Sequence, residues 1–502
     1  MDLSDLIARN AAFTPDKTAI RFEGRALSYA ALTERVAQAA RALKSRVGVG
    51  RGDRVAILAA NHPDYLVLLY ACARLGAMLV PLNWRLAVPE QVFILADASV
   101  KALVVEESFA AVMPFLTQAL PDVHVIGLDF APGGTSFDGL VASGRGDGRN
   151  PHIDFSCPFL VVYTSGTTGR PKGAVLRQEA LVWNAAMSQH MHGLTADDHV
   201  LTVLPLFHVG GLNIQTTPAL QIGATVTIHP RFAPDATLAA FAADRPTLAV
   251  LVPATIQALV RHPRWNETDL SSLRAITTGS TVVPRPLVDA VTARGVPVLQ
   301  VYGSTETCPI AIYTRLGGDL SRDSTGMPGL YCEARIVDDD GKEVPHGGTG
   351  EVAVRGPNVF FEYWGNEAAT SEALRNGWYY TGDVGTRDPD GYFVIHDRKK
   401  NVIISGGENI YAAEVERVLN EHPAVAEAAV IGRPDPKWQE VPVAYVVRHQ
   451  GAAVDAETLT RHVGEQLARF KIPRAVVFVD DLPRNALGKV QHFRLKQQAG
   501  ES

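Results

Sequence analysis

The chain has 502 residues, of which 46% are hydrophobic and 20% are charged. At about 100 to 200 residues per domain, this length predicts about three or four structural units with a large core, and the near-average composition excludes wholesale disorder. The 47 Lys and Arg residues stand against 53 Asp and Glu, a formal net charge of −6. Without a basic excess or a long Lys/Arg run, we expect no binding to nucleic acid.

Short apolar runs alternate with helical patterns over the first 325 residues. A buried helix is predicted over residues 64–75. Strands are predicted over residues 55–59, 78–81, 102–105, 159–163, 225–229, 248–252, 275–278 and 298–301. Strands interleaved with helices indicate an α/β fold built in layers.

The most apolar stretch, residues 65–82, is interrupted by Arg74 and Gly76. It is shorter than the about 20 apolar residues that cross a bilayer, so we expect no transmembrane segment. The N-terminus carries no signal-peptide pattern, and the scattered cysteines at 72, 157, 308 and 332 suit neither a disulfide framework nor a structural zinc site. We therefore expect a cytoplasmic protein with reduced thiols.

The pattern changes after about residue 325. Residues 333–337 and 349–354 flank the turn Asp338-Asp339-Asp340-Gly341, which predicts an antiparallel hairpin in a β-rich subdomain. A further unit follows His396, with strands predicted over residues 402–404, 428–431, 441–447 and 475–478 and helices over 412–419 and 456–467. A unit of about 100 residues can fold independently. We expect a large N-terminal domain at 1–397 and a small, mobile α+β domain at 398–502.

A glycine-rich loop follows the strand predicted at 159–163. It reads Tyr163-Thr164-Ser165-Gly166-Thr167-Thr168-Gly169-Arg170-Pro171-Lys172-Gly173. Glycines let the backbone approach an anion and present N–H groups to it, hydroxyls donate to phosphate oxygens, and Lys172 adds a positive charge. The loop predicts a polyphosphate site, although its spacing differs from the GxxxxGK[ST] of a Walker A loop.

This loop resembles the signature of the adenylate-forming superfamily, which includes acyl-CoA synthetases, luciferases and the adenylation domains of peptide synthetases. Further segments that resemble the family pattern follow in order along the chain. They are Leu204-Pro205-Leu206-Phe207-His208, Tyr302-Gly303-Ser304-Thr305-Glu306, Tyr380-Thr381-Gly382-Asp383, Asp397-Arg398-Lys399-Lys400, Ser405-Gly406-Gly407-Glu408-Asn409 and Pro483-Arg484-Asn485-Ala486-Leu487-Gly488-Lys489. The resemblance covers essentially the whole chain and implies an ATP-dependent acyl-CoA synthetase.

The resemblance implies a nucleotide site. In it Tyr302 stacks on adenine, Thr305 contacts the α-phosphate, and Glu306 holds Mg²⁺, for which a carboxylate is a suitable oxygen ligand. Asp383 accepts hydrogen bonds from both ribose hydroxyls, with Arg398 as a second ribose or phosphate contact. The residues assigned to ATP and AMP are Thr164, Ser165, Gly166, Thr167, Thr168, Gly169, Lys172, Gly279, Ser280, Tyr302, Gly303, Thr305, Asp383 and Arg398.

The C-terminal motifs are implied to act in turn. Lys489 reaches the active site only in the adenylating arrangement, where it touches the substrate carboxylate and the α-phosphate. Lys400 is the implied hinge, and Gly406 and Gly407 line the pantetheine channel after the small domain has rotated. The family often has glycine where this chain has Asp397, which leaves the backbone geometry before Arg398 open.

The acid pocket is the least defined part of the resemblance. His208 is implied to border the pocket and the pantetheine channel, as a gate rather than a general base, and completes the catalytic set with Lys489, Thr305 and Glu306. The pocket is assigned to Trp183, His208, Val209, Gly211, Gly279, Gly303, Cys308 and Ile310. These residues include no arginine for a second carboxylate, which disfavours a dicarboxylic acid. Medium-chain fatty acids and aryl or arylpropenoic acids of the feruloyl type both stay open.

The implied reaction has two steps and three small partners. A carboxylate attacks the α-phosphorus of ATP and pyrophosphate leaves; the thiol of coenzyme A (CoA) then attacks the acyl-adenylate and AMP leaves. ATP, Mg²⁺ and CoA are therefore expected, and a homodimer is an open expectation because relatives often form one.

Three alternatives remain to be distinguished. An adenylation enzyme that loads an acyl carrier protein shares these motifs, although His208 stands where amino-acid-activating domains usually place an acid. A non-catalytic nucleotide-binding homologue is opposed by the intact Glu306, Asp383, Arg398 and Lys489. A luciferase-like oxygenase would emit light from an adenylate and oxygen.

Overall fold

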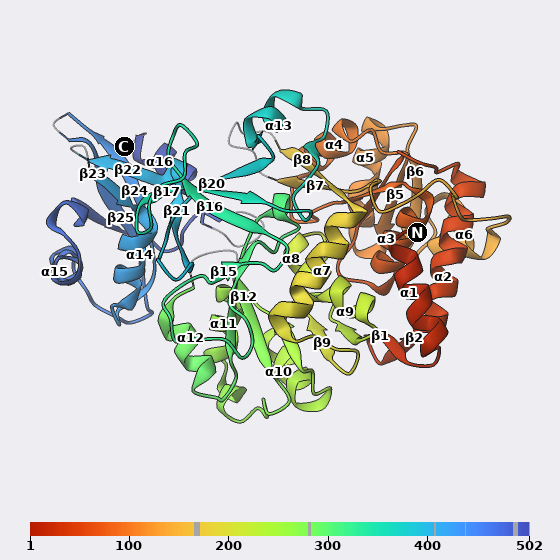
Figure 1. The fold of residues 1–502 in the computed structure, drawn as a ribbon, viewed down its shortest axis with the longest axis horizontal. Helices are drawn as coiled ribbons and strands as arrows, with labels where there is room; N and C mark the ends of the chain where they lie inside the picture. The colour runs from red at the N-terminus through yellow and green to blue at the C-terminus, as the bar shows by residue number, and fades with distance from the viewer. Residues whose placement is uncertain (165–170, 280–282, 406–407, 437, 485–489, 501–502) are drawn as a thin grey trace.

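The computed structural model describes residues 1–164, 171–279, 283–405, 408–436, 438–484 and 490–500 (Figure 1). A large N-terminal domain carries two wide sheets and a smaller β-rich part, and a small domain lies at the C-terminal end of the molecule.

A seven-stranded sheet has the order β18-β8-β7-β4-β3-β5-β6. Its strands are β3 Arg54–Leu58, β4 Met78–Pro81, β5 Ala102–Glu106, β6 His124–Leu128, β7 Pro158–Thr164, β8 Lys172–Arg177 and β18 Glu362–Tyr363. A nine-stranded sheet has the order β15-β14-β13-β12-β11-β9-β10-β1-β2. Its strands are β1 Thr18–Phe22, β2 Arg25–Ser28, β9 His199–Thr202, β10 Thr225–Ile228, β11 Leu248–Val250, β12 Ala275–Gly279, β13 Val298–Tyr302, β14 Ile312–Tyr313 and β15 Met327–Pro328.

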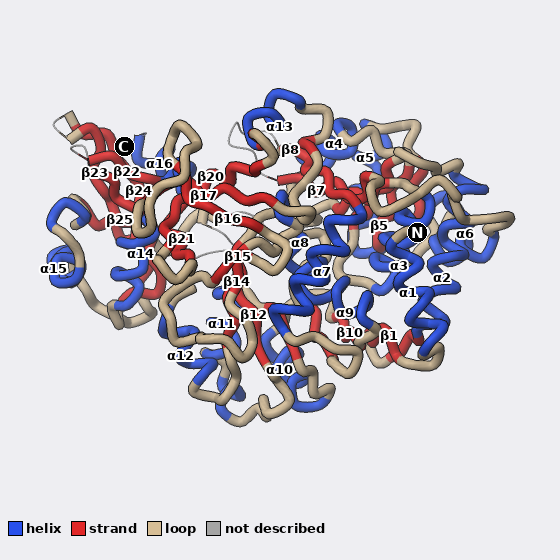
Figure 2. The backbone as a smooth tube through the Cα atoms, in the orientation of Figure 1, coloured by secondary structure: helices blue, strands red, loops and turns tan. Residues whose placement is uncertain are grey.

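Helices fill the space between these sheets and cover their outer faces (Figure 2). The helices of the N-terminal domain are α1 Leu3–Phe13, α2 Tyr29–Ala42, α3 Pro63–Leu75, α4 Val88–Asp97, α5 Met113–Ala119, α6 Phe137–Ser143, α7 Gln178–His192, α8 Val209–Gly211, α9 Thr217–Ile222, α10 Pro234–Ala243, α11 Pro253–Val260, α12 Arg285–Thr292 and α13 Glu367–Ala373. Both faces of each of these sheets are therefore buried, as is usual for parallel strands, and the predicted α/β layers are confirmed.

Alternation along the strands explains the layers. On β3, Val55 and Ile57 join the core between the two sheets, whereas Ala56 and Leu58 pack on the opposite face under α4 and α5. On β9, Val200 faces the central core and Leu201 faces α10, α11 and α12. Successive side chains of a strand point to opposite faces, so continuous apolar runs arise where both faces are buried.

Helix α3 shows how local sequence sets an element. His62 caps its first turn by accepting from the Asp64 N–H at 3.1 Å, Pro63 occupies the first turn, and Gly76 ends the helix at φ 71°. Pro suits the first helical position and glycine the left-handed C-terminal one. The predicted helix at 64–75, followed by the strand β4, is confirmed.

The β-rich part confirms the predicted hairpin. β16 Glu333–Val337 pairs antiparallel with β17 Thr349–Arg355, and β17 pairs with β20 Trp378–Arg387. Two further strands, β19 Leu374–Arg375 and β21 Phe393–Arg398, also pair with β20 and complete this sheet.

The small domain has its own sheet and core. Its elements are β22 Val402–Ser405, β23 Glu408–Tyr411, α14 Ala412–Glu421, β24 Val425–Asp435, β25 Gln439–Arg448, α15 Ala456–Gln466, β26 Ala475–Phe478 and α16 His492–Gly500. The α+β character and every strand and helix predicted after residue 396 are confirmed. The boundary at 397/398 stays a proposal; it falls at the end of β21.

Asp397 joins the two domains at this boundary. Its Oδ1 accepts from the Arg398 N–H at 2.6 Å and from Asn401 Nδ2 at 3.1 Å, and its Oδ2 accepts from the Ala413 N–H at 2.9 Å. Ala413 lies in the first turn of α14, where backbone N–H groups lack helical partners. The residue that departs from the family pattern therefore caps a helix of the small domain.

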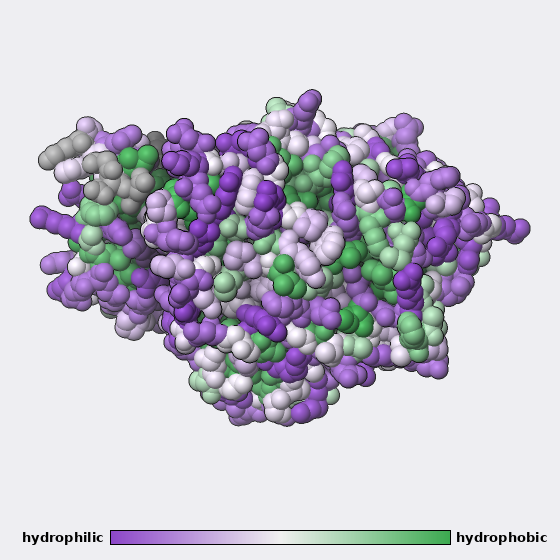
Figure 3. All heavy atoms as spheres, viewed as in Figure 1, coloured by the Kyte–Doolittle hydropathy of each residue, from purple (hydrophilic) through white to green (hydrophobic). Residues whose placement is uncertain are grey.

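The surface and the cysteines of the structure match what the composition suggests. Hydrophilic residues cover most of the face in Figure 3 and hydrophobic ones appear in small groups. The four cysteines are buried and unbridged. Within the described residues, no helix combines the length and apolar character that crossing a membrane demands.

Candidate active site

The predicted phosphate loop joins two antiparallel strands. β7 ends at Thr164 and β8 begins at Lys172, and these two residues are register partners, with Thr164 Oγ1 3.4 Å from the Lys172 carbonyl oxygen. Lys172 Nζ lies 5.3 Å from the centre of the Tyr363 ring. The loop residues Ser165, Gly166, Thr167, Thr168 and Gly169 lie outside the described residues.

Glu306 lies in a short 3₁₀ turn, η6 Thr305–Thr307, directly after β13. Its carboxylate Oε1 accepts from the Tyr363 hydroxyl at 2.8 Å, and its carbonyl oxygen accepts from the Phe360 N–H at 2.7 Å. Thr305 and Glu306 are both buried. Tyr363 thus touches the predicted metal ligand through its hydroxyl and the predicted phosphate lysine through its ring.

Asp383 gathers the predicted nucleoside residues. Its Oδ2 accepts from the Tyr302 hydroxyl at 2.7 Å, and its Oδ1 lies 2.6 Å from Arg398 Nε. An ionised carboxylate only accepts hydrogen bonds, which is the chemistry that the two hydroxyls of a ribose require. The structure therefore brings together Tyr302, Asp383 and Arg398 from β13, β20 and β21.

The protonation states of Tyr302, Tyr363 and Arg398 suit the contacts that these side chains make. Burial, together with the Asp383 charge, raises the pKa of Tyr302 well above 10, and burial with the Glu306 charge raises the pKa of Tyr363. Both phenols therefore stay protonated and donate to carboxylates. Burial alone lowers the pKa of Arg398, but the Asp383 charge and its neighbours outweigh it and raise that pKa, so the guanidinium stays charged.

Tyr379 bridges the two clusters. Ser304 Oγ lies 3.4 Å from the Tyr379 hydroxyl, and the Tyr379 ring packs edge-on against Phe360 with ring centres 5.4 Å apart. Phe360 in turn packs against Tyr363 at 4.7 Å. This aromatic group therefore connects Tyr363, the partner of Glu306, to Ser304 of the YGxTE segment. The YGxTE and TGD motifs located the acids but gave no sign of Phe360, Tyr363 or Tyr379.

Several residues assigned to the acid pocket lie in tightly packed backbone, at α8, at the end of β12 and after β13. His208 Nδ1 accepts from the Gly210 N–H at 3.1 Å and caps this helix, and Val209 is buried. A Cβ at Gly211 would lie 2.3 Å from the Pro205 carbonyl oxygen, so only glycine fits there. Gly279 and Gly303 are held in the same way against the backbone of Val301 and Pro309.

The remaining pocket residues differ in exposure. Cys308 is fully buried and its Sγ accepts from Asn213 Nδ2 at 3.6 Å, while the buried Ile310 donates its N–H to Asn184 Oδ1 at 3.2 Å. Trp183 is 37% exposed and packs on Tyr331 with ring centres 4.8 Å apart.

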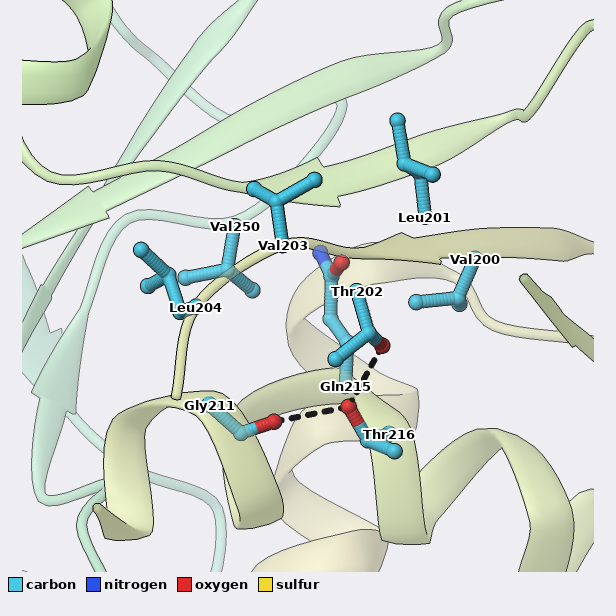
Figure 4. Close-up of a pocket in the computed structure, with 9 residues that line it drawn as sticks. All are labelled: Val200, Leu201, Thr202, Val203, Leu204, Gly211, Gln215, Thr216 and Val250. Carbon is cyan, nitrogen blue, oxygen red and sulfur yellow. Dashed lines mark hydrogen bonds between the residues drawn. The ribbon is translucent and has the colours of Figure 1, made fainter. Parts of the chain in front are cut away.

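A small cavity of about 10 Å³ lies beside Gly211 (Figure 4). Its walls come from β9 and the segment after it, from β11, and from η4 Leu212–Thr216, a π-helical segment that follows α8. The nine residues that line it are Val200, Leu201, Thr202, Val203, Leu204, Gly211, Gln215, Thr216 and Val250.

Four further assigned residues lie outside the described residues: Ser280, Gly406, Gly407 and Lys489. Lys400 belongs to the backbone turn η7 Lys399–Asn401, but its side chain is not among those described.

The donor set fits magnesium held together with a nucleotide. Within the described parts of the chain, no three His, Cys, Asp or Glu side chains form a metal cluster. Mg²⁺ usually binds through one or two carboxylates plus substrate phosphates. Glu306 is a buried carboxylate, and its partner Tyr363 also faces Lys172. Glu306 is therefore the residue that would hold the ion.

Comparison with known proteins identifies the family. A model described as AMP-binding enzyme matches residues 7–364, and one described as AMP-binding enzyme C-terminal domain matches residues 414–489. The chain belongs to the AMP-binding enzyme family. This confirms the predicted adenylate-forming superfamily and its acyl-CoA synthetase branch, an AMP-forming acid–thiol ligase.

Relatives of this AMP-binding enzyme match over nearly its full length. It is 51% identical to indoleacetate–CoA ligase of Aromatoleum aromaticum, covering 99% of this chain and 98% of the relative. It is 41% identical to feruloyl-CoA synthase of an Amycolatopsis species, covering 98% of each.

Solved structures agree in fold. The o-succinylbenzoate CoA synthetase of Bacillus subtilis, in complex with its acyl-adenylate intermediate, superposes with a TM-score of 0.89 at 34% identity, covering 99% of this chain and 98% of that one. The same enzyme with ATP and magnesium ion has a TM-score of 0.87 at 33% identity, covering 99% of both chains. The expected ATP, Mg²⁺ and CoA chemistry is thus that of the family.

A buried histidine beside the acid pocket predicts a pH dependence of stability. Burial lowers the pKa of His192 from 6.5 to about 4; a hydrogen bond to the Ser188 carbonyl and the Asp198 charge oppose this shift, and the Arg274 charge adds to it. The unfolded chain therefore binds a proton that the folded chain excludes. The unfolding free energy should be highest above pH 6.5 and fall by up to about 3 kcal/mol as the pH drops toward 4.

Urea unfolding of the wild type and of His192→Asn at pH 7 and pH 4.5 measures this share. We expect the loss of stability on acidification to be smaller in the variant. An unchanged loss would contradict the role of His192.

Proposed function

We propose that the chain is an ATP-dependent ligase that joins an aryl-substituted carboxylic acid to CoA, through an acyl-adenylate, with release of pyrophosphate and AMP. The observation that carries the proposal is a pair of neighbouring groups: Tyr302 and Arg398 contact Asp383, and Tyr363 donates to Glu306, whose charge acts on Arg398. These groups suit a ribose and a metal-bound phosphate side by side.

The relatives support the aryl acid. Indoleacetate and ferulate each carry an aromatic ring, and the relatives named for their CoA ligation match the chain at 51% and 41% identity. We propose an arylacetic or arylpropenoic acid rather than a medium-chain fatty acid. The pocket residues Val209, Gly211 and Ile310 are apolar or small, which suits a flat apolar ring.

The first half-reaction uses the residues of the N-terminal domain. Asp383 holds the ribose, Tyr302 packs against the base, and Thr305 and Lys172 bind phosphate oxygens while the carboxylate attacks the α-phosphorus. A magnesium ion on Glu306 would neutralise charge on the phosphates. Positioning and charge stabilisation are the main contributions of a protein to such transfers.

The second half-reaction uses the small domain. We propose that this domain, residues 398–502, turns about Lys400, withdraws Lys489 and brings Gly406 and Gly407 to the pantetheine arm of CoA. The thiol sulfur then bonds to the acyl carbon as the bond to AMP breaks. A cytoplasmic location and a homodimer belong to the same proposal; size-exclusion chromatography with light scattering tests the dimer.

A substrate panel tests the function. Pyrophosphate release is measured with indole-3-acetate, ferulate, cinnamate, benzoate, octanoate, palmitate and malonate, each with and without CoA. We expect CoA-dependent turnover that peaks on an aryl acid. Turnover that peaks on octanoate would refute the aryl assignment, and release that stops at about one equivalent regardless of CoA would point to a carrier protein as acceptor.

The hinge makes a prediction of its own. Lys400→Pro should leave adenylate formation within about threefold of wild type and reduce CoA transfer at least about tenfold, because proline fixes φ at the turn η7. The two half-reactions are measured separately by pyrophosphate release and by thioester formation from supplied acyl-adenylate. Lys399→Ala, which removes the contacts to Asp339 and Glu351 at 2.8 and 3.3 Å, is the neighbouring control. Normal overall turnover of Lys400→Pro would contradict the hinge.

A further inference from the structure

A chain of hydrogen bonds beneath the acid pocket ends on Gln215. His192 Nδ1 lies 2.7 Å from the Ser188 carbonyl oxygen, and His192 Nε2 lies 2.8 Å from Thr277 Oγ1. Gln215 Nε2 lies 3.3 Å from the same Thr277 oxygen. All four side chains are buried.

The direction of each bond in this chain follows from its first member. A carbonyl oxygen only accepts, so His192 Nδ1 carries the proton and, the imidazole being neutral, Nε2 is an acceptor. Thr277 must then donate its hydroxyl proton to His192, which leaves the Thr277 oxygen to accept from Gln215. The nitrogen of the Gln215 amide therefore points to Thr277, and its oxygen points elsewhere.

That oxygen has no hydrogen-bond donor in the part of the chain that the structure describes. Gln215 is 1% exposed. Gln215 lines the 10 Å³ cavity, and Figure 4 shows its side chain reaching from η4 toward Thr202 and Val203. A buried acceptor without a donor costs about 1–3 kcal/mol, and the cavity has room for about one water-sized group.

The backbone around Gln215 is held in place. η4 is a π-helical segment, a rare form that is frequent at functional sites. From α7, Asn184 Nδ2 donates to the Asn213 carbonyl at 2.6 Å and Ser188 Oγ donates to the Ile214 carbonyl at 2.6 Å. The amide is thus fixed before any ligand arrives.

The cavity shares a residue with the predicted acid pocket. Gly211, a predicted pocket residue, forms part of its wall. Thr277, which orients the amide, is two residues before Gly279 on β12, a separation of about 7 Å along a strand.

We infer that Gln215 Oε1 is a specificity-determining acceptor at the inner end of the acid pocket, and that it accepts a hydrogen bond from an N–H or O–H carried on the aryl ring of the substrate. The inference rests on the proposed function, because it concerns the acid that the ligase activates. A ring without a donor would leave the buried oxygen unsatisfied, so such acids are poorer substrates.

Matched acids test the inference. Indole-3-acetate is compared with 1-benzothiophene-3-acetate, which replaces the ring N–H by sulfur, and ferulate with 3,4-dimethoxycinnamate, which lacks the phenolic O–H. For the wild type we expect kcat/KM for CoA ligation to favour the donor by about tenfold or more in at least one pair, equivalent to one neutral hydrogen bond. The two pairs distinguish an N–H from an O–H donor.

Variants connect the preference to Gln215. Gln215→Met should bring the favoured ratio close to one by selective loss on the donor-bearing acid. Gln221→Met, the same change at the end of α9 and outside the cavity, should leave the ratio as in the wild type. A ratio that persists in folded Gln215→Met overturns the inference.

A second measurement does not depend on the variant folding. We expect the ring N–H of ¹⁵N-labelled indole-3-acetate, bound to the wild type with a non-hydrolysable ATP analogue, to shift downfield and exchange slowly with solvent. An unshifted, fast-exchanging N–H with a ratio near one in both pairs overturns the inference while leaving aryl-acid ligation intact. Absence of turnover with every aryl acid overturns the proposed function and the inference together.

Discussion

Lys489→Ala is expected to lower the rate of adenylate formation by about 10²–10³-fold. Loss of one preorganised donor at a site of developing charge has an effect of this size, and the proposed role of Lys489 is confined to the first half-reaction. Thioester formation from supplied acyl-adenylate and CoA should therefore stay within about threefold of wild type. Pyrophosphate release and thioester formation are measured separately on the same preparation.

The control is Lys496→Ala. Lys496 lies on α16, a few residues further along the chain, so the change removes a nearby positive charge without touching the proposed catalytic motif. It should leave both half-reactions unchanged. Equal loss of both half-reactions in Lys489→Ala would refute the assigned role, because a lysine needed in both steps is not withdrawn between them.

Glu306→Gln is expected to reduce kcat/KM for pyrophosphate release by about 100-fold or more. The amide keeps an oxygen that accepts from the Tyr363 hydroxyl, now 2.8 Å away, so the local fold has its hydrogen bond but the negative charge is lost. Loss of a group that stabilises transition-state charge typically costs about 10²–10³ in rate. A titration with Mg²⁺ should show half-saturation at a higher concentration.

Tyr363→Phe tests whether the charge of Glu306 or its hydrogen bond to Tyr363 matters more for activity. It keeps the ring that faces Lys172 and Phe360 but removes the donor to Glu306. We expect a loss of about tenfold or less, the range of a single hydrogen bond. If Glu306→Gln retains the wild-type rate and the wild-type Mg²⁺ dependence, Glu306 is not the metal ligand.

Local periodicity was sufficient for much of the fold. Apolar runs such as residues 78–81 and 475–478 match β4 and β26 to the residue, because strands buried on one or both faces need apolar side chains. The turn at 338–341 fixed the β16–β17 hairpin. The strands β8 and β20 were not predicted, since their residues carry motif glycines and hydroxyls that hide the apolar pattern.

The sequence motifs pointed to the charged residues of the candidate site but not to the aromatic residues that contact them. Motifs pointed to Tyr302, Asp383 and Arg398, which contact one another in the structure, and to Glu306, which contacts Tyr363. They carried no information on Tyr363, which arrives from β18, at the edge of another sheet. The orientation of Gln215 depends on contacts between α7, η4 and β12, which are far apart in sequence, so no local pattern encodes it.

Asp397 has a consequence for the balance between conformations. Its carboxylate caps α14 across the domain boundary, and a helix cap contributes about 1 kcal/mol. A rotation that carries α14 away from Asp397 loses this energy, which makes the rotated state about fivefold rarer unless another acceptor replaces the carboxylate. Glycine at this position, which the family pattern often has, carries no carboxylate to cap α14 and so does not favour either arrangement in this way. In the proposed rotation about Lys400, coenzyme or adenylate binding would therefore have to offset about 1 kcal/mol before the second half-reaction begins.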